Sequence, residues 1–178
     1  MSRYGLIEQL TSIILLLRDY PQGLSILLGS LPPPTCEDIS EIIETVRRSP
    51  EPTLDPSGQP LRVDGGFDYI EADALIDCEE RFNRIVESSG GWEHINEVTR
   101  GWAKKYKKEW SVIADYVRWP KSKIDGISLI QLASEHQISR TSVYAIIEDF
   151  PQNLSVAIMY TPVKNELCLS AEINPAAV

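Results

Sequence analysis

The chain has 178 residues, a formal net charge of −9, 43% hydrophobic residues and 24% charged residues. These values fit one ordinary domain with a packed core and exclude collagen-like, low-complexity and disulfide-scaffold proteins. Cys36, Cys78 and Cys168 are far apart and form no CxxC pair, so the sequence indicates no metal site. The most apolar run, Ile13–Leu17, is too short to cross a bilayer, and we expect a cytoplasmic protein with no membrane partner.

The first third of the chain predicts three helices. Residues 4–19 carry apolar side chains at helical spacing, which is typical of an amphipathic helix. Residues 23–31 predict a second, short helix that ends at three consecutive prolines. Either Thr35 or Asp38 can cap a third helix, which runs to about Arg48.

A segment rich in proline and glycine divides the chain. Residues 49–66 predict a linker between an N-terminal helical region, 1–48, and a C-terminal DNA-binding domain, 67–178. Two further helical stretches follow, at 70–88 and at 92–118, and the second is either one long helix or two helices that meet near Glu109. Its tryptophans repeat at helical spacing and are expected to pack in the core.

Positive charge is concentrated in the C-terminal half. Residues 1–99 hold seven Lys and Arg against eighteen Asp and Glu, net −11, whereas residues 100–150 hold nine against six, net +3. Such a local basic patch can approach a phosphate backbone, although a solvated helix face is the simpler interpretation of a lysine run. The side chains that we expect to contact DNA phosphates are Arg100, Lys104, Lys105, Lys107, Lys108, Lys121 and Lys123.

Residues 127–149 have the pattern of a helix-turn-helix. Ala133 is small where the two helices would cross, and Ser139 can cap the second helix with its hydroxyl group. Val143 and Ile147 lie one turn apart and would point inward. The outward, N-terminal face of the second helix would then read bases in the major groove. The expected base-contacting residues are Ser139, Arg140, Thr141 and Tyr144.

Two features depart from the pattern. Gln137 or His136 occupies the turn position that often holds glycine, so a less permissive residue must make the bend. Glu148 and Asp149 follow the base-reading positions and would repel phosphates if they faced DNA.

The basic helix, the Gly126–Leu129 connection and the helix-turn-helix together resemble helix-turn-helix transcription regulators. Residues 92–149 are similar in arrangement to sigma-factor region-4-like domains and to the small phage late-gene regulators built on them. The resemblance implies a double-stranded DNA partner, a contact with RNA polymerase and a phage origin.

The end of the chain predicts a β-hairpin over 154–173, because two β-rich runs flank a polar break. After a recognition helix, a hairpin can form the wing of a winged helix with Lys164 near its tip, or it can cover the core or mediate dimer contacts. The predicted fold class is therefore mainly α: a helical bundle with a C-terminal helix-turn-helix followed by a β-hairpin.

No pattern for catalysis is present. Asp73 and Asp77 share a helix face, but an exposed acidic face is the simpler interpretation, and the chain has no nucleophile elbow, phosphate loop or dinucleotide fingerprint. We expect no catalytic residue, cofactor or metal.

Two functional hypotheses remain. The first is a sequence-specific DNA-binding transcription regulator whose N-terminal helices form a homodimer or touch RNA polymerase. The second is a non-enzymatic assembly adaptor, such as a phage packaging or anti-host factor, which would use the helix-turn-helix as a packing unit.

Overall fold

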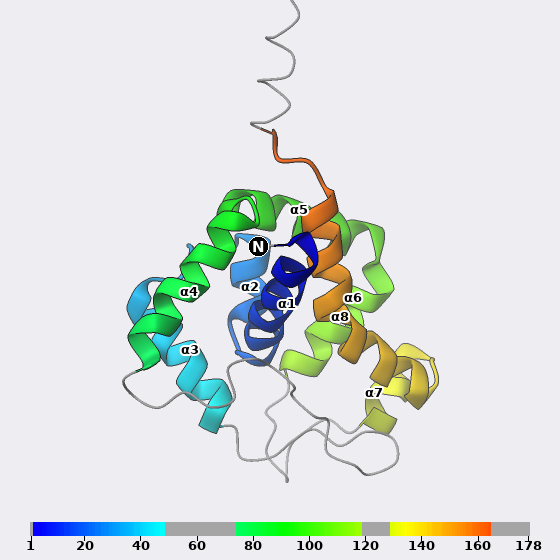
Figure 1. The fold of residues 1–178 in the computed structure, drawn as a ribbon. Coiled ribbons are helices and arrows are strands. Elements are labelled where there is room, and N and C mark those ends of the chain that lie inside the picture. The colour runs from blue at the N-terminus through cyan, green and yellow to red at the C-terminus, as the bar shows by residue number, and fades with distance from the viewer. Residues whose placement is uncertain (1, 49–73, 119–128, 165–178) are drawn as a thin grey trace, which may run out of the picture.

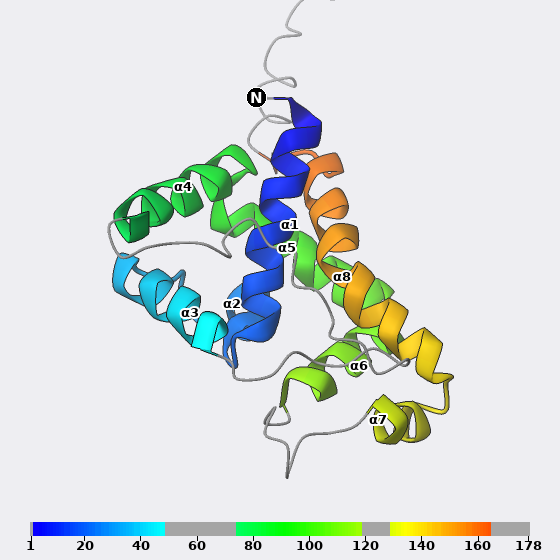
Figure 2. The same ribbon diagram turned by 60° about the horizontal axis from the view of Figure 1, so that its bottom comes forward.

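The computed structural model of the chain describes residues 2–48, 74–118 and 129–164 and, within them, eight helices and no strand. Helix α1 is central, with α8 along one side and α2, α3 and α4 on others (Figures 1 and 2). The helices are α1 (Arg3–Asp19), α2 (Gly23–Leu28), α3 (Cys36–Arg48), α4 (Ala74–Ser88), α5 (Gly91–Lys105), α6 (Lys107–Arg118), α7 (Leu129–His136) and α8 (Arg140–Tyr160).

Most helices lie where the apolar periodicity predicts them. The stretch at 92–118 forms two helices, and they meet at Tyr106, three residues before the expected position. Tyr106 has φ −111° and ψ 57°, which interrupts the helical backbone. The expected linker at 49–66 lies outside the described residues.

One large core joins both ends of the chain. It contains Leu10 of α1, Ile42 of α3, Phe82 of α4, Ile95 of α5 and Phe150 of α8, all almost inaccessible to solvent. The N-terminal helices and the helix-turn-helix region are therefore parts of one packed unit.

Aromatic side chains pack together where α5 meets α6. The Trp102 ring centroid lies 4.9 Å from that of Tyr106, 6.3 Å from that of Trp110 and 5.4 Å from that of Phe150. Trp102 is buried, which confirms for this residue that the tryptophan repeat marks core positions.

The predicted β-hairpin is wrong, and with it the winged-helix alternative. Residues 154–160 belong to α8, and within the described residues no strand is present; 165–173 lie outside them. Buried side chains along α8 follow a three-to-four-residue period, which is helical: Val143, Ile147, Phe150, Leu154 and Ile158. Packing on α1 and α5 outweighs the β-propensity of the local sequence.

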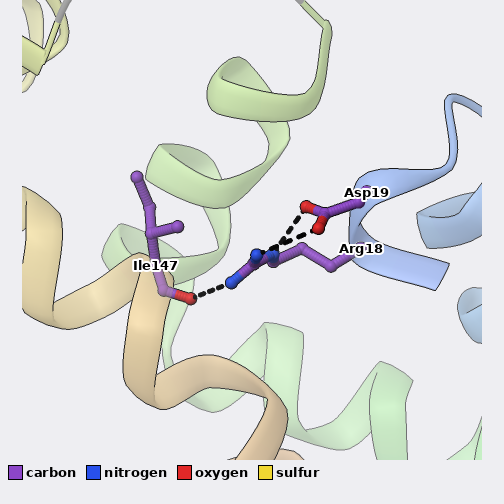
Figure 3. Close-up of polar contacts among 3 residues, drawn as sticks. All are labelled: Arg18, Asp19 and Ile147. Atoms are coloured by element: carbon purple, nitrogen blue, oxygen red, sulfur yellow. Dashed lines mark hydrogen bonds and ion pairs between the residues drawn. The ribbon is translucent and has the colours of Figure 1, made fainter. Parts of the chain in front are cut away.

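Helix α8 continues through Pro151, and a buried arginine of α1 replaces the hydrogen bond that the proline removes. Proline has no N–H, so the Ile147 carbonyl four residues earlier loses its usual helical donor. Arg18 supplies the missing donor: its Nη1 lies 2.8 Å from the Ile147 carbonyl oxygen (Figure 3).

The guanidinium group of Arg18 is held on three sides. Its Nε and Nη2 donate to the two carboxylate oxygens of Asp19 at 3.0 and 3.2 Å. It also lies 5.9 Å from the ring centroid of Tyr116 in α6. Arg18 is only 6% exposed, and a buried charge is stable only with such partners. One side chain thus connects α1, α6 and α8.

Replacing Arg18 tests this connection. We expect Arg18→Met to lower the free energy of unfolding by about 3–5 kcal/mol, because it leaves a buried carboxylate and a buried carbonyl without their donor. In a Pro151→Ala background, the new N–H can donate to the Ile147 carbonyl, so the same substitution should cost about 1–2 kcal/mol less. Urea unfolding of the four proteins measures this coupling, and strictly additive losses would contradict it.

Helix α3 begins with a reciprocal cap. The Thr35 backbone N–H donates to Asp38 Oδ2 at 2.8 Å, and the Asp38 N–H donates to Thr35 Oγ1 at 3.3 Å. This is a capping box with Asp in place of Glu. The hydrogen bond from the Thr35 backbone, and then that from its hydroxyl group, lower the pKa of the Asp38 carboxyl group.

A depressed carboxyl pKa gives the cap a defined pH dependence. The ionised Asp38 stabilises the start of α3 above the ordinary carboxyl pKa, and this contribution disappears as the pH falls through the lower, folded-state pKa. NMR titration of the Asp38 carboxyl carbon should give a midpoint below the ordinary Asp value. Thr35→Ala keeps the backbone donor but removes the hydroxyl donor. It should therefore raise the pKa of Asp38 only part of the way to the ordinary Asp value. A midpoint unchanged from a model peptide would contradict the cap.

Candidate nucleic-acid interface

Helices α7 and α8 are joined by a tight turn at Gln137. This residue has φ 55°, in the left-handed region, and is the only non-glycine residue with positive φ in the described part of the chain. The N–H of Ile138 donates to the Ala133 carbonyl at 3.0 Å, and the N–H of Gln137 donates to the Ser134 carbonyl at 3.3 Å. The pair of bonds is a Schellman cap, which normally favours glycine at this position. The bend falls at one of the two positions expected from the sequence.

A small second core holds the helix-turn-helix together. Its members come from α6, α7 and the first half of α8, and Leu129, Ile138 and Ile146 pack against it. Ala133 is buried where the helices meet, as its size predicts. The buried members are Val112, Tyr116, Leu132, Ala133, Val143 and Ile147. Residues 129–150 together with α6 therefore form a three-helix unit.

Ser139 starts the second helix. Its Oγ accepts a hydrogen bond from the Ser142 backbone N–H at 3.0 Å, as expected for an N-cap. Arg140 and Thr141 follow in the first turn and are exposed, and Tyr144, one turn later, is half-buried. The structure thus places Ser139, Arg140 and Thr141 on an exposed face at the N-terminal end of α8, with the half-buried Tyr144 one turn later.

Acidic side chains flank this face. Glu148 and Asp149 are exposed on α8, and Glu135 is exposed on α7. Glu148 lies two turns beyond Arg140, or about 12 Å along the axis. The first two turns of α8, which precede Glu148, hold no carboxylate.

Among the described residues, the predicted phosphate-contacting side chains differ in their surroundings. Arg100 Nη1 donates to the Leu28 carbonyl oxygen at 3.0 Å, so this guanidinium group caps the C-terminus of α2. Asn96 assists it by donating to the Ile26 and Leu27 carbonyl oxygens at 2.7 and 2.9 Å. Arg100 therefore has a structural role at the N-terminal helices.

The remaining described lysines lie near the junction of α5 and α6. Lys105 lines a groove between α5 and α8, with its Nζ 5.2 Å from the centroid of the Tyr106 ring. Lys104 is exposed at the end of α5. Lys107 and Lys108 are exposed in the first turn of α6, one turn before Val112 enters the second core. The other two expected residues, Lys121 and Lys123, lie outside the described residues.

A hydrogen bond that sequence analysis missed links α6 to α7. His136 Nε2 lies 2.7 Å from Asp115 Oδ2, and both side chains are partly buried. His136 is therefore more than a turn residue, because it attaches the end of α7 to its neighbour. The two residues are 21 apart, and no sequence pattern connects them.

Other classes of site receive no support. Among the described residues, no group of three or more His, Cys, Asp or Glu side chains could hold a metal ion. No helix in the described ranges combines the length and apolar character needed to cross a membrane. Comparison with family models, with curated proteins and with solved structures finds no match to this chain.

The strained turn gives a stability test. Gln137→Gly should raise the free energy of unfolding by about 1 kcal/mol, because glycine adopts the left-handed conformation without steric cost. Glu135→Gly, two residues earlier and inside exposed helix, should lower it by about 0.5–1 kcal/mol. Chemical denaturation of both variants measures the difference. If Gln137→Gly is destabilising, the turn has another geometry.

Proposed function

We propose that this chain is a sequence-specific DNA-binding transcription regulator that works without catalysis. The observation that carries the proposal is the three-helix unit of α6, α7 and α8, with Ser139, Arg140, Thr141 and Tyr144 on the outward end of α8. An α-helix fits the major groove, and in a helix-turn-helix the start of the second helix contacts the base edges.

The chemistry of this end of α8 is suited to DNA. Its N-terminus carries the positive end of the helix dipole, which favours nearby phosphates. Arg140 can donate two hydrogen bonds to guanine, and hydroxyl groups such as that of Thr141 can contact several bases. The acidic side chains at Glu148 and Asp149 limit the insertion to the first two turns.

Phosphate contacts would come from the exposed lysines beside this unit. Lys107 and Lys108 extend from the helix that supports the second core, and Lys104 lies just before it. We assign a lesser part to Arg100, because its guanidinium group already caps α2. Lys121 and Lys123, which precede α7 in the sequence, remain candidates for the same role.

A protein partner is part of the proposal. Tyr4 and Tyr160 are 75% and 64% exposed, at the adjacent ends of α1 and α8. Figures 1 and 2 both show these ends side by side. Exposed aromatic rings suit a contact with RNA polymerase or a second copy of the chain. Such a role implies a cytoplasmic location, and a phage origin would fit it.

A second candidate function is a protein-binding adaptor. The observation that favours it is Ile130 on α7, which is 61% exposed and precedes the exposed polar residue Gln131. An apolar side chain within a polar rim is typical of a protein contact. In this case the helix-turn-helix would serve as a packing unit.

A binding experiment separates the two candidates. DNA sites are first selected from a random duplex library with the full chain, and affinities for the selected and random duplexes are then measured. We expect Arg140→Ala to reduce the ratio of specific to random affinity roughly 5- to 150-fold, since a groove-directed arginine contributes about 1–3 kcal/mol of discrimination.

Two lysine variants and one arginine variant complete the test. Lys104→Ala and Lys107→Ala should each weaken binding to all duplexes about equally and reduce the salt slope by about one. Arg3→Ala removes the same charge as Arg140→Ala at the other end of α8, about 30 Å away, and should change nothing. Failure of the unmodified chain to retard any duplex at low salt would favour the adaptor.

A further inference from the structure

A groove runs between α5 and the second half of α8. Its volume is about 870 Å³. Trp102 and Tyr106 line it from the first helix, and Val156 and Ala157 line it from the second. Val156 and Tyr106 are more than a third exposed, which is unusual for adjoining apolar side chains in a folded protein.

The described part of the chain ends at the rim of this groove. Thr161, Pro162 and Lys164 belong to its lining. Lys164 Nζ lies 2.6 Å from Glu97 Oε1 on α5. Val163 lies against the start of α5, with a methyl carbon 3.0 Å from where a Cβ on Gly90 would be.

We propose that the segment 165–178 of this chain docks in the groove, with Leu167 and Leu169 as its apolar anchors. In an extended segment, side chains two residues apart point to the same side, so both leucines can face the groove together. The proposal is independent of DNA binding, because the groove lies on the opposite half of α8 from Arg140.

The dimensions permit this docking. Leu167 and Leu169 follow Lys164 by three and five residues, so an extended chain carries them up to about 10–17 Å from it. Gly101 and Lys105 lie four and eight residues beyond Glu97, or about 6 and 12 Å along α5. The leucines therefore reach the middle of the groove.

Tethering also favours this occupant. The groove lining holds Lys105 and Lys164 but also Glu97 and Glu109, so its charges balance, and apolar contact has to hold the segment in place. Because the segment is covalently attached at the rim, its effective concentration at the groove is on the order of millimolar, which no separate partner reaches easily.

A cysteine cross-link in the full chain tests the proposal. Cys36→Ser, Cys78→Ala and Cys168→Ser remove the native thiols. Leu167→Cys then places a small apolar thiol on the side of the segment that carries Leu169, and Gly101→Cys adds one at the groove. Gly101 is exposed and nothing lies within 4 Å of a Cβ built there, so the substitution fits. If positions 167 and 169 face the groove, mild oxidation should join positions 101 and 167 within one molecule.

Lys104→Cys in the same background is the matched control, because it is exposed on the same helix but does not line the groove. We expect cross-linking to the cysteine at position 167 to be at least tenfold faster from position 101 than from position 104. Leu169→Asp, which replaces the remaining leucine anchor, should remove the difference. Equal rates from the two positions would overturn the proposal.

Hydrogen exchange of the unmodified chain provides a second measurement that needs no substitution. The amides of 167–169 should exchange at least tenfold more slowly than expected for an unstructured peptide. Exchange at the unstructured rate would overturn the docking even if the cysteine variants fail to fold. Neither result depends on DNA, so the two proposals can fail separately.

Discussion

The architecture depends on how α8 passes through Pro151 without ending. The proline leaves the Ile147 carbonyl without its helical donor, and Arg18 of α1 donates to it from a buried position. Asp19 balances the charge of Arg18, and Tyr116 lies against it from α6. Since a buried guanidinium group without these partners would be strongly destabilising, α1, α6 and α8 must fold together.

This constraint makes α8 a shared element of both cores. Its first half packs with α6 and α7 around Val143 and Ile147, and its second half packs with α1 and α5 around Leu154 and Ile158. Where α1 crosses α8, the Thr11 hydroxyl group donates to Ser155 Oγ at 3.0 Å. The proposed DNA-reading face and the proposed docking groove therefore occupy opposite ends of one helix, so each can be altered without direct contact with the other.

Basic residues that are close together in the sequence have different roles in the folded chain. Residues 100–123 are strongly basic in sequence, yet Arg100 caps α2 and Lys105 lines the groove. Only some of the basic side chains are therefore available to contact DNA phosphates. Among the described residues, Lys107 and Lys108 extend from the helix that supports the helix-turn-helix, and we expect them to contribute most to phosphate binding.

The sequence by itself determined most of the helices, the Ser139 cap and, to within two residues, the turn before α8, because apolar periodicity and helix caps are local features. Only the tertiary structure decided the rest. Residues 154–160 have β-propensity but form helix, because burial of Leu154 and Ile158 on α1 and α5 outweighs local preference. The pairing of His136 with Asp115, and of Arg18 with the Ile147 carbonyl, joins residues 21 and 129 positions apart, and periodicity carries no information about contacts at such separations.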